Sequence, residues 1–378
     1  MTRILLVGNY RPDRQHSMLR YCEWLASILT GRGFQVDVLE PSIHFGGWVA
    51  TSHPAHKWLG YLDKFLLFPF SLYRQAGRYD VVHICDQSNA LYRRFARRTS
   101  VTLTCHDLIA VRSMLGEFEG QKLRWSGRVL QGWILSSLKT IKRVACVSAS
   151  TAEDLERLAP CPERHCDVIE NPVIGFSPMT SDEAEPALAA AGVGPNIPFF
   201  LCVGSNLWYK NRIGILRLFA ETLKQPGLED MYLVCAGAEL SPELRSMAAT
   251  LGILPRVREV VSPSSDLLRA LYSKASALLF TSLVEGFGWP IIEAQACGCP
   301  VVTSDREPMK SIGGEQAALF VDPGRPAEAA KTVGDRWQWL SSRKDASLAN
   351  AARFSQQKAA DEYVAFFDAA ARQGTSRP

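Results

Sequence analysis

Short apolar runs with the character of buried β-strands alternate with helical segments along most of the chain. Because continuous apolar runs are typical of strands covered on both faces, this alternation predicts parallel α/β units. In the first half of the chain the predicted strands are 3–9, 34–40, 79–86, 100–105, 143–148 and 166–170. The second half starts the pattern again, with predicted strands at 199–204, 231–236, 277–281, 300–303 and 318–321.

The segment 172–198 separates the two halves and is rich in Pro, Ala, Gly and acidic residues, a composition typical of a linker with an irregular lead-in. At 378 residues the chain is also long for a single core. We therefore predict two Rossmann-like, doubly wound domains, 1–172 and 173–354, facing a central cleft. A C-terminal helix within 355–378 is expected to cross back to the N-terminal domain. Ligands of such open sheets bind beyond the carboxyl ends of the strands.

The composition excludes several classes of protein. With 47% hydrophobic and 21% charged residues it is that of an ordinary globular protein, and no apolar run reaches the about 18 residues that span a bilayer. The chain enters a β-like run directly at its N-terminus, so we expect no signal peptide. The ten cysteines lack zinc-ligand spacing and there is no Asp-x-Asp motif. We expect reduced thiols in a cytoplasmic protein and no metal site.

Positive charge is concentrated in residues 1–150, which hold 20 Lys and Arg against 10 Asp and Glu, whereas the remainder holds 22 against 28. A basic half suggests an anionic partner. Within it, 57–74 combines six aromatic residues with Lys57, Lys64 and Arg74, which suits an interfacial helix on an anionic membrane surface. The alternative is a helix packed against the N-terminal sheet, with ordinary basic surface around it. We expect no nucleic-acid partner.

The richest motif follows the strand predicted at 277–281 and runs from Glu285 through Gly286-Phe287-Gly288 to Glu293. Glycines permit a tight turn and close approach of a ligand to main-chain N–H groups, and the start of a helix favours an anion such as a diphosphate. Two carboxylates that flank such a turn can accept hydrogen bonds from several sugar hydroxyls. Glu293 is expected in the first turn of that helix. The alternative is a glycine-rich connection with two solvated glutamates.

The stretch from Glu285 to Val302, with Cys297-Gly298-Cys299-Pro300-Val301-Val302 after the glutamates, resembles the signature of the retaining glycosyltransferases of family 4 (glycosyl transferases group 1). That family has the GT-B fold of two Rossmann-like domains and generally needs no metal or other cofactor. The resemblance implies that Glu285 holds donor-sugar hydroxyls and acts in catalysis. It further implies that Glu293 binds the ribose of the donor, and that main-chain groups of Gly286, Phe287 and Gly288 contact its sugar and diphosphate.

A second matching stretch runs from Ser205-Asn206 to Lys210-Asn211, where a strand gives way to a helix. A lysine there can neutralise the diphosphate of a departing nucleotide, so Lys210 is a predicted catalytic residue, with Ser205, Asn206 and Asn211 as donor-binding residues. The family usually has an arginine where this chain has Ser205. Arg212 or an N-terminal arginine are candidates to replace it.

In the first half, His106-Asp107 resembles the family's histidine that reaches the donor sugar, so His106 is a predicted catalytic residue and Asp107 a cleft residue. The structural alternative for a single histidine is a satisfied core position. The first strand–helix loop lacks the family's Gly-Gly pair. It does not read Gly-x-Gly-x-x-Gly either, which disfavours a nicotinamide cofactor. The remaining candidate residues that line the acceptor side are Arg14, Gln15, His16 and Ser17.

These features together predict a retaining, metal-independent transferase that moves a sugar from a UDP- or GDP-sugar to a hydroxyl. The expected acceptor is a saccharide, in particular a lipid-linked saccharide of surface or exopolysaccharide biosynthesis, reached by a protein peripheral to the inner face of the cell membrane. A soluble transferase acting on a small acceptor, and a nucleotide-sugar-binding protein without transferase activity, are the alternatives.

Overall fold

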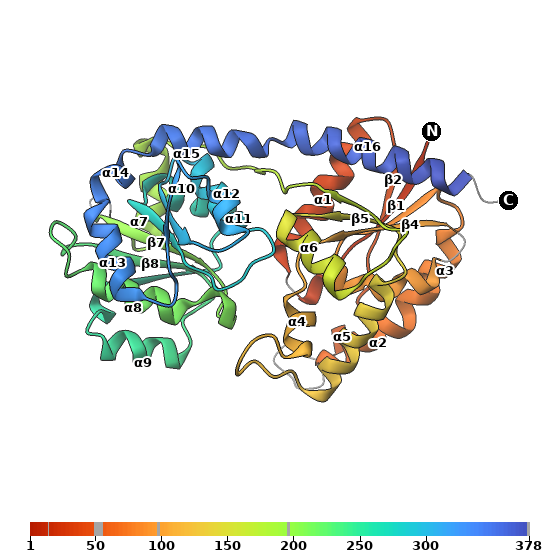
Figure 1. The fold of residues 1–378 in the computed structure, drawn as a ribbon, viewed down its shortest axis with the longest axis horizontal. Helices are drawn as coiled ribbons and strands as arrows, with labels where there is room; N and C mark the ends of the chain where they lie inside the picture. The colour runs from red at the N-terminus through yellow and green to blue at the C-terminus, as the bar shows by residue number, and fades with distance from the viewer. Residues whose placement is uncertain (14, 49–55, 97–98, 195–196, 376–378) are drawn as a thin grey trace. The chain divides into compact units, whose positions relative to one another are not determined.

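The computed structural model describes residues 1–13, 15–48, 56–96, 99–194 and 197–375. The chain divides into two compact units (Figure 1): unit 1 comprises Met1–Glu170 with Gln357–Pro378, and unit 2 comprises Asn171–Gln356. Each unit is built on one six-stranded sheet, and all neighbouring strands in both sheets run parallel. The predicted α/β class, with a doubly wound sheet in each half of the chain, is confirmed.

The sheet of unit 1 has the order β2-β1-β3-β4-β5-β6. Its strands are β1 (Arg3–Val7), β2 (Gln35–Leu39), β3 (Val81–Ile84), β4 (Ser100–Cys105), β5 (Arg143–Cys146) and β6 (His165–Val168). Its helical segments are η1 (Arg11–Asp13), α1 (His16–Gly31), η2 (Phe45–Trp48), α2 (His56–Leu62), η3 (Asp63–Leu67), α3 (Phe68–Ala76), η4 (Gln87–Phe95), α4 (Ile109–Leu115), α5 (Trp125–Leu138), α6 (Ala149–Leu158) and α16 (Gln356–Thr375).

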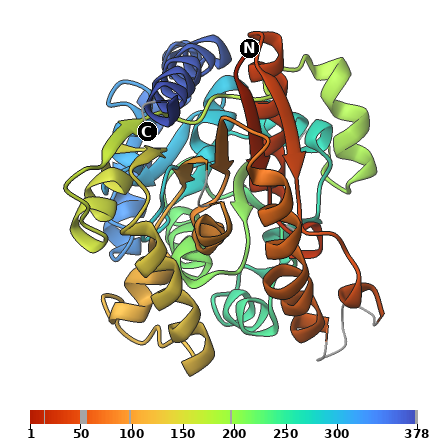
Figure 2. The same ribbon diagram turned by 90° about the vertical axis from the view of Figure 1, so that its right-hand side faces the viewer.

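Both faces of this sheet are covered, which explains why its strands read as continuous apolar runs. On one face, apolar side chains of β1, β3, β4 and β5 pack with α3, η4, α4, α5 and α6. On the other face lie α1 and α16, the long blue helix of Figures 1 and 2. Tyr363 of α16 accepts a hydrogen bond of 2.6 Å from Tyr21 of α1, and Tyr21 lies 2.8 Å from Thr104 of β4. The C-terminal helix is thus part of the core of unit 1.

The sheet of unit 2 has the order β12-β11-β10-β7-β8-β9. Its strands are β7 (Phe199–Gly204), β8 (Tyr232–Gly237), β9 (Val257–Val261), β10 (Ala277–Phe280), β11 (Val301–Ser304) and β12 (Ala318–Val321). Its helical segments are α7 (Ser181–Ala190), η5 (Trp208–Lys210), α8 (Arg212–Thr222), α9 (Pro242–Thr250), η6 (Leu254–Arg256), α10 (Ser265–Lys274), α11 (Trp289–Ala296), α12 (Met309–Gly313), α13 (Pro326–Asp335), α14 (Trp337–Ser341), α15 (Lys344–Ala351) and η7 (Ala352–Phe354).

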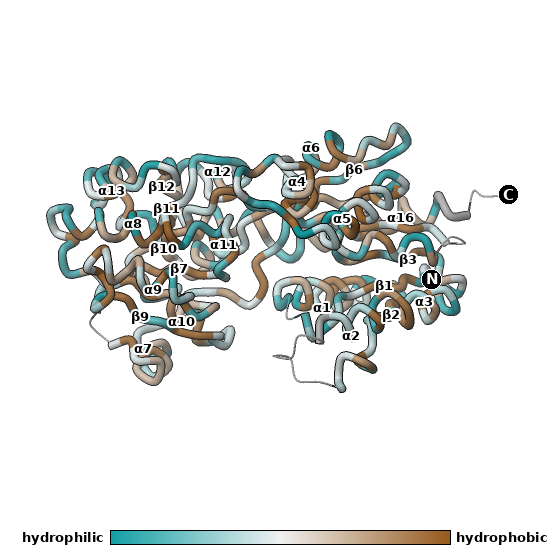
Figure 3. Tube along the Cα trace, turned by 90° about the horizontal axis from the view of Figure 1, so that it is seen from below, coloured by the Kyte–Doolittle hydropathy of each residue, from teal (hydrophilic) through white to brown (hydrophobic). Residues whose placement is uncertain are grey.

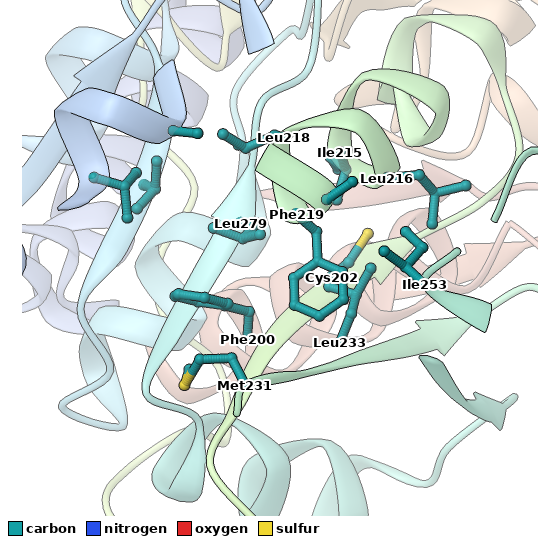
Figure 4. Close-up of a cluster of buried hydrophobic side chains, with 14 of the residues drawn as sticks. Phe200, Cys202, Ile215, Leu216, Leu218, Phe219, Met231, Leu233, Ile253 and Leu279 are labelled. Atoms are coloured by element: carbon teal, nitrogen blue, oxygen red, sulfur yellow. The ribbon is translucent and has the colours of Figure 1, made fainter. Parts of the chain in front are cut away.

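The main core of unit 2 lies between its sheet and the helices α8, α9, α13 and α14. Figure 4 shows Phe200 and Leu279 of the sheet together with Phe219 of α8, and the rings of Phe200 and Phe219 meet edge to face. In Figure 3 the apolar, brown segments follow the strands of both sheets. Such a core holds the strand ends, and therefore the loops that follow them, in fixed places.

Two predictions about local structure were wrong. The strand β9 was missed, because Arg258 and Glu259 interrupt its apolar pattern at the edge of the sheet. The expected irregular lead-in at 172–198 contains the helix α7, which packs against α10. Thr180 begins α7 with a capping box in which its side chain and that of Glu183 each accept a hydrogen bond from the other's backbone N–H, a helix-start pattern that outweighed the surrounding prolines.

Candidate active site

The loops that follow β7, β10 and β11 leave the same edge of the unit 2 sheet, because these strands are parallel neighbours. The loop after β7 carries Lys210, and the loop after β10 carries Glu285. The ammonium Nζ of Lys210 lies 2.7 Å from Oε1 and 3.0 Å from Oε2 of Glu285. Residues that are 75 positions apart in the sequence are thus joined in one charged pair.

This pair is largely withdrawn from solvent. The side chain of Glu285 is 8% exposed and that of Lys210 is 20% exposed. The lysine ammonium also lies 5.4 Å from the ring centre of Phe280, the last residue of β10. An ion pair in such surroundings has a fixed geometry and is little screened by salt. It presents one positive and one negative group at the end of the sheet.

Asn211 sets the position of Lys210. Its backbone is left-handed, with φ of 53°, and its side-chain oxygen accepts a hydrogen bond of 3.2 Å from the N–H of Gly214, which caps helix α8. The side-chain amide donates to the carbonyl oxygen of Thr281 at 2.9 Å, in the loop after β10. Asn211 therefore ties the loop after β7, which carries Lys210, to the loop after β10, which carries Glu285.

The turn at Gly286–Gly288 leads into α11. Gly288 has φ of 108°, and a Cβ atom built on it would lie 3.1 Å from the side chain of Ile291, so glycine is favoured there on both grounds. The ring of Phe287 is buried and meets the ring of Phe354 edge to face. Any contact that Phe287 makes with a ligand is therefore through its main chain. The positive end of the α11 dipole lies at this turn.

Glu293 lies in the second turn of α11, which begins at Trp289, so its expected place in the first turn was wrong. Only 5% of Glu293 is exposed. The phenol of Tyr272, from α10, donates a hydrogen bond of 3.1 Å to Oε2 of this carboxylate. Burial and the neighbouring carboxylate raise the pKa of Tyr272 well above its usual value, so the phenol stays a donor. Tyr272 is a positioning residue that sequence reasoning missed.

Arg212 does not extend from the sheet edge toward a ligand. It is 5% exposed, and its guanidinium donates to the carbonyl oxygens of Gly204 and Ala238, each at 2.7 Å, and to Oδ1 of Asn206 at 2.8 Å. Asn206 in turn donates to the carbonyl oxygen of Glu239 at 2.7 Å. Arg212 thus donates hydrogen bonds to carbonyl groups at the ends of β7 and β8. The prediction that Arg212 replaces the arginine that the family has at the position of Ser205 is therefore wrong. The hydroxyl of Ser205 accepts a long hydrogen bond, 3.5 Å, from the N–H of Leu207.

In unit 1, His106 follows β4 and is 7% exposed. Its Nε2 lies 2.9 Å from the carbonyl oxygen of Cys85 and donates to it, since a carbonyl cannot donate. Burial lowers the pKa of His106, so the ring is neutral near pH 7 and Nδ1 carries its lone pair. Asp107 accepts a hydrogen bond of 3.0 Å from the N–H of Ile109 at the start of α4. This local contact places the carboxylate of Asp107 at the start of α4.

The loop after β1 leaves the same edge of the unit 1 sheet as His106, with β3 between β1 and β4 in the sheet order. Gln15, His16 and Ser17 are exposed at the start of α1, whereas Arg14 lies outside the described residues. The buried Asn9 donates from its amide to the side chain of Gln15 and, at 2.6 Å, to Asp86 beyond β3. Asn9 and Asp86 were not among the predicted site residues, although each is the last residue of a predicted strand.

Comparison with known proteins adds the identity of the family. A model described as "Glycosyl transferases group 1" matches residues 189–361, and one described as "Glycosyltransferase Family 4" matches residues 18–174. The two matches cover most of both units. The chain belongs to this glycosyltransferase family.

Individual relatives of the family are distant. The chain is 28% identical to the serotype-specific mannosyltransferase WbdA of Escherichia coli over 254 residues, which is 62% of this chain but 29% of WbdA. It is 27% identical to D-inositol 3-phosphate glycosyltransferase 1 of Catenulispora acidiphila over 339 residues, covering 82% of this chain and 77% of that protein. The chain therefore spans less than a third of the length of WbdA.

Solved structures show the same fold, GT-B. A sucrose-phosphate synthase from Thermosynechococcus elongatus superposes with a TM-score of 0.77 at 19% identity, over 97% of this chain and 98% of that one. HepE of Anabaena, in complex with UDP and glucose, superposes with a TM-score of 0.73 at 16% identity, over 98% of this chain and 100% of that one.

Proposed function

We propose that this chain transfers a sugar from a UDP- or GDP-sugar to a hydroxyl group, with retention of the anomeric configuration. The observation that carries the proposal is the partly buried Lys210–Glu285 pair, beside the α11 turn at the edge of the unit 2 sheet. The family membership supports glycosyl transfer, and the HepE complex with UDP and glucose shows a nucleotide on a protein of this fold.

In the proposed reaction, the bond between the anomeric carbon and the diphosphate oxygen breaks as the acceptor oxygen bonds to the same face of that carbon. The leaving diphosphate takes the electron pair of the broken bond, and one of its oxygens takes the acceptor's proton. Lys210 and the positive end of the α11 dipole stabilise the charge that grows on the leaving group. Glu285 accepts hydrogen bonds from hydroxyls of the sugar, and Glu293, held by Tyr272, accepts them from the ribose.

Unit 1 is proposed to supply the acceptor side. The lone pair on Nδ1 of the neutral His106 can accept a hydrogen bond from a hydroxyl of the donor sugar, which is its proposed catalytic contact. The exposed Gln15, His16 and Ser17 are proposed to contact the acceptor, at a helix start that favours negative charge. Because protein groups supply the positive charge, we propose that no metal is needed. Transfer should then persist in EDTA.

A lipid-linked saccharide is the proposed acceptor, and the surface of unit 1 supports this choice. The run α2–η3–α3 exposes large apolar side chains, among them Trp58 at 64%, Leu66 at 63% and Phe70 at 63%. Such a face suits the boundary between lipid headgroups and acyl chains. Within the described ranges, none of the helices is long and apolar enough to cross a membrane. WbdA, named as a serotype-specific mannosyltransferase, agrees with a role in surface polysaccharide synthesis.

The test of the function is incubation of the purified chain with radiolabelled UDP- and GDP-sugars and bacterial lipid extract. The proposal expects a labelled lipid product from one donor, no product from Glu285→Gln, and binding of that donor by both proteins. Donor binding without any product would favour a nucleotide-sugar-binding protein without transferase activity. This hypothesis arises because the chain has Ser205 where the family usually has an arginine.

The membrane role is tested separately by co-sedimentation with vesicles that contain anionic lipid. Replacing Trp58, Leu66 and Phe70 together by Ser should release the chain from vesicles, while its transfer to a detergent-solubilised acceptor continues. Unchanged sedimentation of this variant would show that the α2–η3–α3 face does not carry the membrane binding. A wild type that does not sediment with the vesicles would favour a soluble transferase acting on a small acceptor.

A further inference from the structure

Lys210 alone supplies too little positive charge to neutralise a diphosphate at the proposed donor site. A nucleoside diphosphate carries several negative charges, but the ammonium of Lys210 already lies within 3.0 Å of both carboxylate oxygens of Glu285. The two charges cancel, so the pair alone offers no net positive charge to an anion. The guanidinium of Arg212 is committed to carbonyl groups at the ends of β7 and β8. A further cation is needed at this sheet edge.

Arg306 has the required position. It lies two residues beyond the end of β11, the strand beside β10 in the sheet. Its Nη1 donates a hydrogen bond of 3.3 Å to the carbonyl oxygen of Leu283, two residues before Glu285. The N–H of Leu283 in turn donates to the carbonyl oxygen of Tyr209, the neighbour of Lys210, at 2.8 Å. Arg306 and Lys210 therefore flank the same segment, the one that carries Glu285.

The loop that carries Arg306 is firmly attached to that segment. Thr303, in β11, donates from its hydroxyl to the carbonyl oxygen of Phe280 at 2.9 Å, and Ser304 donates to the carbonyl oxygen of Ser282 at 2.5 Å. Both donors are fully buried, and such bonds fix the end of β11 against the loop after β10. The backbone at Arg306 is thus positioned before any ligand arrives.

The side chain of Arg306, by contrast, is weakly held. It is 47% exposed, and its ion pair with Asp322 is long, with 3.9 Å between Nη2 and Oδ1. Asp322 is shared with Arg325, whose Nε lies 3.4 Å from Oδ2. A guanidinium with one long carbonyl contact and a shared, distant carboxylate can turn to an anion at little cost. Its planar fork matches phosphate oxygens in a bidentate geometry.

We propose that Arg306 is the second cation of the donor site and binds the diphosphate of the nucleotide sugar opposite Lys210. The inference rests on the proposed function, because it assumes that a nucleoside diphosphate binds at this sheet edge. Arg306 then takes the charge-neutralising role that Ser205 and Arg212 do not fill.

The test compares Arg306→Ala and Arg306→Lys with Arg325→Ala, which removes an arginine from the same Asp322 without touching Leu283. Dissociation constants for UDP, GDP, UMP and GMP are measured by calorimetry at fixed salt. For the nucleotides that the wild type binds, Arg306→Ala should weaken binding of the diphosphate by about 10- to 100-fold, the size expected for a lost charge-assisted hydrogen bond. Binding of the matching monophosphate should weaken much less. The affinity of Arg306→Lys for the diphosphate should be intermediate, and that of Arg325→Ala should equal the wild-type affinity.

If Arg306 acts only structurally, through its bond to Leu283, then Arg306→Ala should weaken binding of the diphosphate and of the monophosphate by the same factor. That result overturns the inference. A second variant makes the test independent of folding. Introducing Ser205→Arg into Arg306→Ala should restore at least part of the diphosphate preference, whereas no restoration speaks against a missing charge. If the wild type binds neither UDP nor GDP, the proposed function fails together with the inference. If it binds one of them and Arg306→Ala binds it equally well, the inference alone fails.

Discussion

Replacing Lys210 by Met tests the charged pair in two ways at once, because the pair is proposed to serve both the fold of unit 2 and the reaction. Methionine keeps the length and much of the apolar stem of lysine but removes its charge. The change leaves the carboxylate of Glu285, 8% exposed, without the ammonium at 2.7 Å. A matched control is Lys224→Met, which breaks an ion pair of the same 2.7 Å length whose lysine is 66% exposed.

The size of the effect follows from the geometry. At a separation near 2.7 Å and an effective dielectric constant of about 20, the gross attraction between unit charges is about 6 kcal/mol. Desolvation of both groups offsets much of this, and breaking a fully buried pair costs about 3–5 kcal/mol. Because the lysine is 20% exposed, we expect about 2 kcal/mol of lost stability for Lys210→Met. Lys224→Met should cost at most about 0.5 kcal/mol.

Urea unfolding of the wild type, Lys210→Met, Glu285→Gln and the double variant separates the two roles. In the double variant no unpaired charge remains, so its loss of stability should be smaller than the sum of the single losses by about 1–2 kcal/mol. Transfer should fall by about 100- to 1,000-fold in Lys210→Met and should not recover in the double variant, because the charge that stabilises the leaving group is still missing. Additive losses of stability, or transfer by Lys210→Met within threefold of the wild type, would contradict the proposed roles of the pair.

Three further changes test separate parts of the structure. His83 is buried between Thr102 and Thr104, and burial lowers its pKa to about 3. Because the pKa of this histidine in the unfolded chain is about 6.5, the unfolded chain binds more protons than the folded chain between these two pKa values. Unit 1 should therefore lose about 2 kcal/mol of stability as the pH falls from 7.5 to 5. Urea titrations should show a smaller loss of stability for His83→Gln over the same pH range. Gly288→Ala, at φ of 108° and with a Cβ contact of 3.1 Å, should lower the thermal midpoint and weaken donor binding, whereas an unchanged midpoint would argue against the strained turn. Tyr272→Phe removes the 3.1 Å hydrogen bond to Glu293, and calorimetry should show nucleotide affinity lower by about 3- to 15-fold, with binding of free sugar unaffected.

Most of the fold could be predicted from the sequence, because buried parallel strands need continuous apolar runs. The strands β4, β7 and β12 were predicted with their observed bounds. The edge strand β9 could not be found in this way, since Arg258 and Glu259 are tolerated where one side of a strand has no neighbour. Helix α7 begins at a capping box. The prediction of an irregular segment was based on proline content and did not take this motif into account.

The site was predictable to the extent that its residues lie in the loops that follow strands. Lys210 and Glu285 could be named from their loops, and the structure brings them into contact. The inward turn of Arg212 could not be foreseen, because it depends on carbonyl groups that β7 and β8 leave at their ends. Tyr272 and Arg306 come from segments without a recognisable motif. They became visible only through their contacts with Glu293 and Leu283.

Sugar transfer with retention by the Lys210–Glu285 site can be tested through the configuration of the first product formed. The purified chain is incubated with its donor, carrying carbon-13 at the anomeric position, and an acceptor lipid. The one-bond coupling between the anomeric carbon and its proton is then followed by NMR. The proposed reaction gives a product with the same anomeric configuration as the donor, and no such product is expected from Glu285→Gln. A product of inverted configuration, or equal product from Glu285→Gln, would contradict it.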